Sequence, residues 1–372
     1  MNTTYLIAGL SSLMLTIAAM FFAKGVFPKL GLMDRPHKYG LNRKPIPYPV
    51  GILLYLVFLL LSLVFLEPTA KLIGLLLGAG LLVAISFVDD RIDLPPWLRL
   101  CVQALVAIIL VLSGIGIETI TNPFGGYLAL NEINLTFNWG DAAYTLVLFS
   151  ALFTVLWIVL LVNTMNWLDG IPGLVSGISV LGSLTLFFLS ISDLVNQPEI
   201  AMMAILVAMI ALGAWLFDFF PPKVIIGDSG SMFFGLMLAS LAIFSGGKIA
   251  TTFLILGFAI LDALYVIIYR LFKRRAPWKG GEWDKYRKAV HLHHRLLQFG
   301  FSERQALLVV YFLSGLFGVI ALFFGHARKI HGYCLCGHPF FDHRTYPSRK
   351  TLEKTRVKSP LFIVNRMVPH QQ

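Results

Sequence analysis

The chain has 372 residues, of which 57% are hydrophobic and only 13% are charged. Because soluble domains carry about a quarter charged residues, this composition excludes an ordinary soluble domain and indicates an integral membrane protein. The formal net charge of +11 fits a membrane topology with basic cytoplasmic loops. No basic helix with base-reading side chains is evident outside the apolar runs, so we expect no nucleic-acid partner.

Long apolar runs recur along the chain, each close to the ~20 residues that a spanning helix needs. They predict about ten transmembrane helices, over residues 5–27, 49–66, 70–88, 97–115, 143–163, 171–191, 200–220, 230–246, 249–272 and 303–325. The predicted fold is an all-α polytopic membrane protein, with residues 1–325 as one membrane domain.

Two segments differ from these runs. Residues 116–139 alternate apolar and polar residues around Pro-Phe-Gly-Gly, which predicts a small external β-hairpin. Residues 326–372 are polar and basic and contain no apolar run of spanning length. We expect this tail to be disordered, although a reading-frame artefact or a small domain would explain it as well.

The distribution of basic residues predicts the orientation. The first run follows an uncharged MNTTY start and has Lys24 at its far end, so we expect an uncleaved span with the N-terminus outside. One face then collects most of the loop cations, which are Lys29, Arg35, Lys38, Arg43, Lys44, Arg91, Lys223 and those of residues 273–288. The positive-inside rule makes this face cytoplasmic.

Two adjacent carboxylates, Asp89 and Asp90, end the third run. They could be ordinary interfacial residues, but the negative C-terminal end of a helix disfavours carboxylates. A cation should therefore compensate them, either Arg91 and Arg99 or a metal ion. Because adjacent helical residues point about 100° apart, we expect the two carboxylates to have different roles.

The segment NTMNWLDGIPGL, residues 163–174, carries polar residues at helical spacing. Asn163, Asn166 and Asp169 follow an i, i+3, i+6 pattern, which predicts a stripe facing a polar groove. Hydrogen bonding between helices is the alternative interpretation of this stripe. Gly170 and Gly173 permit a sharp turn or a close approach to a ligand.

Two further segments offer groups that suit phosphate. Residues 227–231, GDSGS, read as a turn into a helix, where Asp228 could be a plain N-cap or could hold a metal beside a phosphate. A compact cluster of possible phosphate donors follows later in the chain, and it comprises His291, His293, His294 and Arg295. A surface histidine cluster is the alternative interpretation there.

All these polar segments share the predicted cytoplasmic face. Carboxylates, amides, glycine turns and a basic cluster together form the set of groups needed for Mg²⁺-assisted phosphoryl chemistry. Five segments also resemble, in order and spacing, motifs of the polyprenyl-phosphate N-acetylhexosamine-1-phosphate transferases. They are DRPHKYGLNRKPIPYPVG, FVDDRIDLPPWLR, NTMNWLDGIPGL, PPKVIIGDSGS and HLHHRLLQFG.

The resemblance covers about residues 30–325. It is closer to the bacterial undecaprenyl-phosphate N-acetylglucosamine-1-phosphate transferases than to the muramoyl-pentapeptide branch, because HLHHRL lacks three consecutive histidines. It implies that undecaprenyl phosphate attacks the β-phosphorus of a UDP-sugar, which gives undecaprenyl-diphospho-sugar and UMP. It further implies the bacterial inner membrane, a cytoplasmic active site, a role in starting cell-envelope polysaccharide assembly, and Mg²⁺ or Mn²⁺ as cofactor. A homodimer is possible, and the resemblance does not decide this.

The resemblance also implies roles for individual residues. Asp89, Asp90 and Asp228 are the expected catalytic residues, with Asp228 and Asp89 at the metal, and Lys44 meets the lipid phosphate. The expected nucleotide-side residues are Asn163, Asn166 and Asp169. The residues expected to hold the diphosphate and sugar are His291, His293, His294 and Arg295.

The sequence departs from the family pattern at several positions. Pro172 stands where a second Asp is common, Asp218 stands where an Asn is usual, and the link 276–290 is long. These departures motivate an alternative, an inactive homologue that binds lipid phosphate. A transporter is a second alternative, which predicts ionisable residues near span midpoints, where Asp262 is the clear candidate.

Overall fold

The structure is a computed structural model, and it describes residues 3–36, 43–121, 127–130, 134–139, 142–193, 195–245, 256–272 and 292–335. The chain divides into two units, residues 1–326 and 327–372. The arrangement described below is that of the first unit. The expected disordered tail lies mostly outside the described residues, because the description ends at residue 335.

Helices dominate the described residues. In chain order they are α1 (Thr3–Val26), the 3-10 turn η1 (Phe27–Leu30), α2 (Gly51–Phe65), α3 (Ala70–Ile92), α4 (Pro96–Leu112), α5 (Leu148–Leu168), α6 (Leu174–Ile191), α7 (Pro198–Asp218), α8 (Gly227–Phe244), α10 (Gly257–Phe272), α12 (Leu292–Gln298) and α13 (Glu303–Leu335). Between α4 and α5 lie four strands, β1 (Thr119–Thr121), β2 (Tyr127–Ala129), β3 (Asn134–Trp139) and β4 (Ala142–Val147).

Seven helical segments within the described residues are long and apolar enough to cross a membrane. They are α1 with η1, α3, α5, α6, α7, α8 and the Glu303–Ile320 part of α13. The other three predicted runs coincide with shorter apolar helices, namely α2, α4 and residues Ala259–Tyr269 of α10. The polytopic helical fold is confirmed in this coarser form, and ten crossings stay a prediction.

The strand region differs in detail from the single hairpin predicted over residues 116–139. β1 pairs antiparallel with β2, and β3 pairs antiparallel with β4. Because Ala142–Val147 pairs with β3, helix α5 begins at Leu148 and not at the predicted residue 143. The side of the membrane on which these strands lie stays a prediction.

Local sequence explains where the spanning helices begin and end. The Thr69 hydroxyl accepts a hydrogen bond from the backbone N–H of Leu72 at 3.2 Å, so it caps the start of α3. Proline in the first turn starts α4 and α7. Asp93 in the left-handed region (φ 53°) ends α3 next to the acidic pair.

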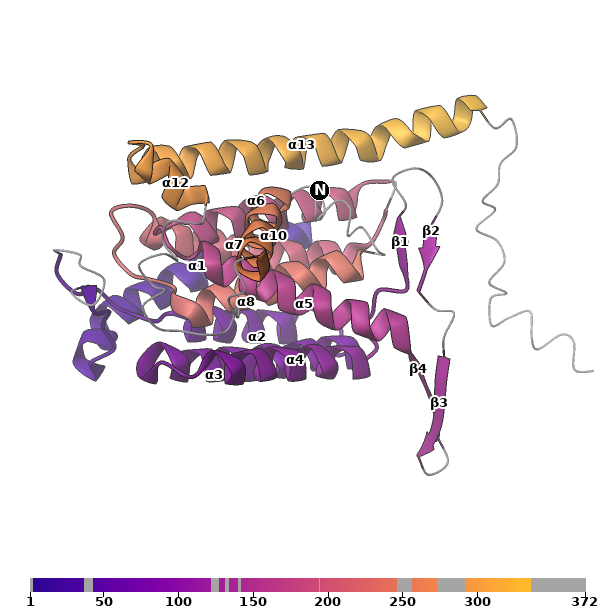
Figure 1. The fold of residues 1–372 in the computed structure, drawn as a ribbon, viewed down its shortest axis with the longest axis horizontal. Helices are drawn as coiled ribbons and strands as arrows, with labels where there is room; N and C mark the ends of the chain where they lie inside the picture. The colour runs from indigo at the N-terminus through magenta and orange to yellow at the C-terminus, as the bar shows by residue number, and fades with distance from the viewer. Residues whose placement is uncertain are drawn as a thin grey trace, which may run out of the picture. The chain divides into compact units, whose positions relative to one another are not determined.

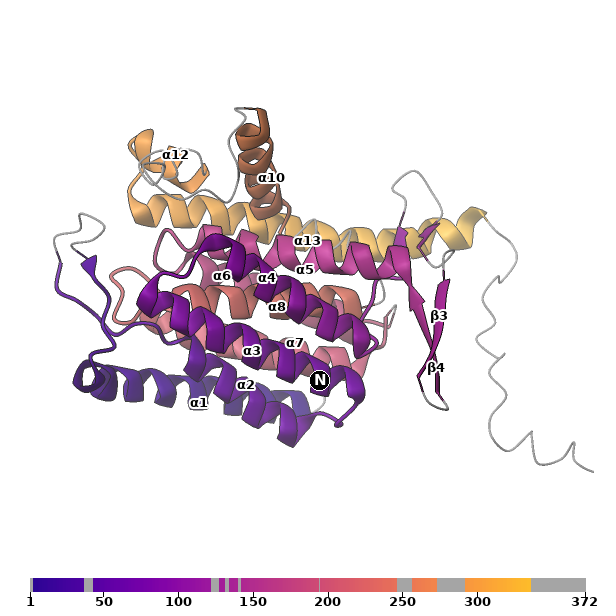
Figure 2. The ribbon, with the colours of Figure 1, turned by 60° about the horizontal axis from the view of Figure 1, so that its bottom comes forward.

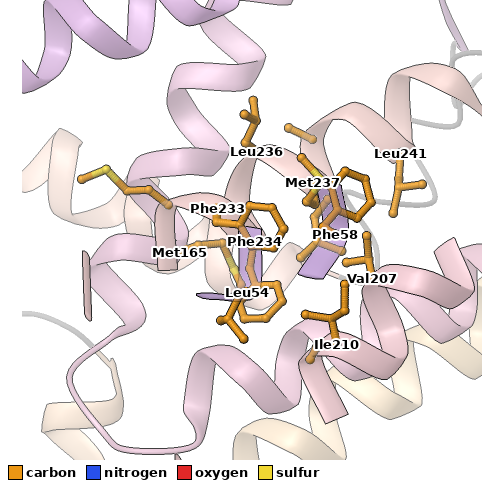
Figure 3. Packing of buried hydrophobic residues seen from close by; sticks show 14 of the residues in the cluster. Leu54, Phe58, Met165, Val207, Ile210, Phe233, Phe234, Leu236, Met237 and Leu241 are labelled. Carbon is orange, nitrogen blue, oxygen red and sulfur yellow. The ribbon is translucent and has the colours of Figure 1, made fainter. Parts of the chain in front are cut away.

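Helix α8 is the centre of the bundle. It contacts α2, α3, α5, α6 and α7, and all its residues except Asp228 and Phe244 are buried. Figure 3 shows part of this packing, where the Phe233 ring lies against the rings of Phe58 (centroids 5.9 Å apart) and Phe234 (5.5 Å). The first turn of α8, which carries Asp228, is therefore held by the whole core.

Helices α1 to α8 lie side by side as a bundle in both views (Figures 1 and 2). Helix α10 crosses the direction of these helices (Figure 2). Since consecutive helices of the bundle alternate in direction, the ends of α3, α5 and α7 meet the starts of α4, α6 and α8. Asp90, Asp169, Asp218 and Asp228 lie at this end of the bundle.

Candidate active site

Asp90 binds the first turn of α8. Its carboxylate accepts hydrogen bonds from the backbone N–H of Asp228 (2.9 Å), from the backbone N–H of Ser229 (3.1 Å) and from the Tyr48 hydroxyl. Free N–H groups and the positive end of the helix dipole both stabilise a carboxylate at this place. Asp90 therefore fixes the helix start that presents Asp228.

Asp89 faces a different set of partners. It is buried, with 4% of its side chain exposed, and its Oδ1 accepts the backbone N–H of Leu94 at 2.6 Å. Its Oδ2 lies 2.9 Å from Nη1 of Arg99, at the start of α4. Asp89 and Asp90 thus have different partners, and their predicted difference in role stays a prediction.

Arg99 links Asp89 on α3 with Asp228 on α8. The same Nη1 atom lies 3.4 Å from Oδ2 of Asp228, so one guanidinium touches a carboxylate on α3 and another on α8. Arg91, the other cation expected here, instead donates to the backbone carbonyl of Gly31 at 3.1 Å. Arg99 is thus the counter-ion that the acidic helix end was predicted to require. We call Asp89, Asp90 and Asp228 the acidic cluster, and Arg99 is its counter-ion.

The donor set of the acidic cluster suits a divalent cation. Asp89 and Asp228 each turn an oxygen toward one shared cationic atom, and Mg²⁺ characteristically takes one or two protein carboxylates and leaves its other positions to water and substrate phosphates. Within the described residues, no three His, Cys, Asp or Glu side chains form a complete metal cage. A cation held here would therefore keep open positions for a ligand.

The segment before α2 is fastened to the segment before α8. The N–H groups of Val50 and Gly51 donate to the carbonyls of Ile225 (3.3 Å) and Ile226 (3.2 Å), and the Ile225 N–H donates to the carbonyl of Pro47 (3.0 Å). A Cβ atom on Gly51 would lie 2.2 Å from the backbone nitrogen of Gly230. These contacts place Tyr48 against Asp90.

Lys44 lies on the same segment and is exposed. Its neighbours are organised by the buried carboxylate of Asp34, which accepts the Ile46 N–H at 2.7 Å and pairs with Arg43 at 2.5 Å. The role of Lys44 at a lipid phosphate stays a prediction. Asp34 and Arg43 were not predicted as site residues, although both lie in a segment that resembles a family motif.

Asn163 and Asn166 lie on one stripe of α5, as the spacing predicts. Asn163 donates to Gln103 of α4 at 2.5 Å, and Asn166 donates to the Ser231 hydroxyl of α8 at 3.3 Å. Both amides bond neighbouring helices, as the alternative interpretation expects. Their predicted role toward a nucleotide is untested.

Asp169 follows α5 at the entrance to the turn that leads into α6. Burial raises the pKa of Asp169 well above its ordinary value, and the negative charges of nearby carboxylates, Asp218 first, raise it further. Asp228 and Asp90 also contribute to this shift, so the turn lies within electrostatic reach of the acidic cluster.

Asp218, at the end of α7, accepts hydrogen bonds from the same turn and from the first turn of α6. It is 1% exposed, and its Oδ2 accepts the Gly173 N–H at 3.0 Å and the Ser176 hydroxyl at 2.8 Å. The Tyr311 hydroxyl of α13 donates to the carbonyl of Gly173. Gly173 itself has φ 87°, a conformation that favours glycine. We call Asp169, Gly173, Ser176, Asp218 and Tyr311 the turn network.

The predicted basic cluster is described only in part. His291 lies outside the described residues, and His293 and His294 lie on α12, whose histidine side chains are also outside the description. Arg295 stacks on Tyr265 of α10, with Cζ 4.8 Å from the ring centroid, and donates to its hydroxyl at 2.8 Å. The phosphate role of this cluster stays a prediction.

Residues 72–246 match the model of the family described as "Glycosyl transferase family 4". This span includes the acidic cluster, the polar stripe of α5 and the turn network up to Asp218. Over these residues the chain is similar to the members of this family.

Individual proteins resemble the chain over most of its length. A probable undecaprenyl-phosphate N-acetylglucosaminyl 1-phosphate transferase of Bacillus subtilis is 29% identical, over 85% of this chain and 84% of its own. The decaprenyl-phosphate N-acetylglucosaminephosphotransferase of Mycolicibacterium smegmatis is 26% identical, over 86% and 82%. The undecaprenyl-phosphate alpha-N-acetylglucosaminyl 1-phosphate transferase of Escherichia coli K12 is 27% identical, over 88% and 89%.

Several residues of the site were not found as site residues from the sequence. Tyr48, Gln103, Ser231 and Tyr311 take part only through contacts with residues distant in the chain. Arg99 had a signal, because an acidic helix end needs a cation. Tyr48 had a weaker one, since it lies in a segment that resembles a family motif.

Proposed function

We propose that the chain transfers N-acetylglucosamine 1-phosphate from a UDP-sugar to undecaprenyl phosphate and releases UMP. The names of the Bacillus and Escherichia relatives support the acceptor and the transferred group. The observation that carries the proposal is the meeting of Asp89, Asp90 and Asp228 at the ends of two apolar helices.

The reaction needs an acceptor phosphate brought in line with a diphosphate. An oxygen of the lipid phosphate forms a new bond to the β-phosphorus, the bond from that phosphorus to the bridging oxygen breaks, and UMP leaves with the electron pair. Positioning and neutralisation of negative charge supply most of the rate in such transfers.

Each part of the acidic cluster has a defined contribution in this proposal. Asp228 and Asp89 would hold Mg²⁺, or Mn²⁺, which when bound supplies positive charge to the transferring phosphoryl group. Asp90 keeps the first turn of α8 in place through its two backbone hydrogen bonds. This geometry favours a positioning role for Asp90 over proton transfer, because both of its oxygens accept hydrogen bonds.

The location of the site suits both substrates. Asp228 is 32% exposed on its side chain, so its end of the bundle is open to a water-soluble nucleotide sugar. The neighbouring helices present apolar side chains outward, among them Leu77, Ile92 and Trp97, which suits the hydrocarbon part of a lipid acceptor. We infer that this end faces the cytoplasm, because it carries Lys29, Lys44, Arg91 and Lys223.

Release of UMP by the purified full-length chain in detergent tests the proposal. The reaction would contain undecaprenyl phosphate, a panel of UDP-N-acetylhexosamines, and either Mg²⁺, Mn²⁺ or EDTA. We expect release that requires both the lipid and a divalent cation, with UDP-N-acetylglucosamine as the best donor.

Two results would contradict the proposal. Release that persists in EDTA would remove the metal requirement, and release without lipid would indicate a hydrolase. No release with any donor, from protein that elutes as a single species, would favour the inactive homologue.

A further inference from the structure

Arg99 contacts two carboxylates of the acidic cluster through a single nitrogen atom. One nitrogen, Nη1, lies 2.9 Å from Asp89 and 3.4 Å from Asp228. A guanidinium carries five N–H donors in a rigid fork. All the hydrogen bonds that the described part of the chain gives this guanidinium use Nη1, so the rest of the fork is available to a ligand.

The two contacts of Arg99 differ in length and in exposure to solvent, and these differences decide which contact a ligand can replace. Asp89 is buried and also binds the Leu94 N–H, so it is fixed in place. Asp228 is 32% exposed, Arg99 is 22% exposed, and the distance between them is the longer of the two. Partly exposed ion pairs with long contacts contribute little to stability. The Arg99–Asp228 contact is therefore the one that a ligand can replace.

A divalent cation and the guanidinium compete for the same carboxylates. If Asp89 and Asp228 bind Mg²⁺ through the oxygens that now face Nη1, two positive groups would meet at one place and repel each other. The guanidinium must then move away from Asp228. Its open donors suit a planar, bidentate contact with phosphate oxygens, which the substrate brings to the same place.

We propose that Arg99 is an exchangeable counter-ion of the acidic cluster. It neutralises Asp89 and Asp228 in the empty protein, gives way to the divalent cation, and then binds a phosphate oxygen of the nucleotide substrate. This inference rests on the proposed function, because it needs both a cation and a phosphate ligand. It gives Arg99 a substrate-binding role, for which the sequence motifs alone provide no indication.

Binding of Mn²⁺, followed by electron paramagnetic resonance on the full-length protein in detergent, tests the exchange without any turnover. We expect Arg99→Gln to bind Mn²⁺ about tenfold more tightly than the wild type, the factor expected when one competing charged contact is lost. If Arg99 instead braces the carboxylates for the metal, affinity falls. Unchanged or weaker Mn²⁺ binding by Arg99→Gln would therefore overturn the inference.

Binding of UMP and uridine, each with Mg²⁺ present, tests the contact with phosphate. Arg99→Gln should weaken UMP binding about tenfold and leave uridine binding unchanged, since uridine has no phosphate. Equal effects on the two ligands, or none on UMP, would overturn the phosphate contact.

Two further variants keep the test valid if Arg99→Gln folds poorly. Arg99→Lys keeps a positive charge beside Asp89 but lacks the planar fork, so we expect near-normal Mn²⁺ affinity and weakened UMP binding. Arg91→Gln is the matched control, because Arg91 contacts the carbonyl of Gly31 and not the cluster. It should change neither measurement.

The same titrations separate this inference from the proposed function. Equal Mn²⁺ binding by the wild type and Arg99→Gln overturns the inference alone. Absence of Mn²⁺ binding in every variant overturns the metal requirement of the proposed function, and this inference with it.

Discussion

The acidic cluster and the turn network both place carboxylates at helix ends, but different groups compensate the carboxylates in the two regions. The acidic cluster is partly exposed and meets a cation, since Asp228 and Arg99 are 32% and 22% exposed. In the turn network, Asp218 is 1% exposed, and its Oδ2 accepts hydrogen bonds from a backbone N–H and a hydroxyl. The proposed exchange of partners concerns the first arrangement, whereas the carboxylate of the second bonds groups of the protein itself.

The largest effect that separates the two regions is expected at Asp228. We expect Asp228→Asn to lower the rate of UMP release by about 10³-fold, the scale of losing one strong electrostatic contact to a transferring group. The melting temperature in detergent should change little, because the side chain is partly exposed and outside the core. Retained activity would exclude Asp228 from the chemistry.

The turn network should respond in stability instead. Asp218→Ala leaves the Gly173 N–H buried without its acceptor, and it leaves the Ser176 hydroxyl with only the carbonyl of Gly173 at 3.1 Å. An unsatisfied buried donor of this kind costs about 1–3 kcal/mol of unfolding free energy. The melting temperature of the purified protein measures this loss.

Asp218→Asn is the matched control for this prediction. An amide oxygen can still accept both hydrogen bonds, and the variant removes a buried negative charge whose Oδ1 has no hydrogen-bond partner in the described part of the chain. We expect the melting temperature of Asp218→Asn to equal or exceed that of the wild type. If Asp218→Asn is as unstable as Asp218→Ala, the charge itself stabilises the turn, and the contrast between the regions fails.

The smallest effect is expected at Tyr48, which belongs to the border of the acidic cluster. Tyr48→Phe removes one of the hydrogen bonds to Asp90 and leaves the two from α8. One hydrogen bond contributes about 0.5–1.5 kcal/mol, so we expect kcat for UMP release to fall by about tenfold or less. A loss as large as that of Asp228→Asn would mean that the Tyr48 hydroxyl contacts the reacting groups.

The sequence predicted those parts of the site that depend on local rules. Apolar runs predicted the spanning helices, and the negative end of α3 predicted a compensating cation, which Arg99 supplies. The 100° between adjacent helical residues predicted different roles for Asp89 and Asp90, and the two side chains have different partners. These rules act within one or two turns of chain, so they need no knowledge of the tertiary packing.

The remaining parts depend on contacts between distant segments. The Tyr48 hydroxyl reaches Asp90, 42 positions away, and Tyr311 reaches Gly173, 138 positions away. The start of α5 was predicted five residues early because pairing of β4 with β3 overrides the apolar character of that segment. Asn163 and Asn166 could not be assigned to helix contacts until their partners on α4 and α8 were known.

The close approach of Gly51 to α8 has a consequence for how this protein can vary. A methyl group at position 51 would meet backbone atoms of Ser229 and Gly230 at 2.4 and 2.2 Å, and backbone cannot turn aside as a flexible side chain can. In a library that replaces residue 51 with every amino acid, we expect glycine alone to survive selection for activity. Because there is no room for even a methyl group here, the packing beside the acidic cluster restricts position 51 to glycine.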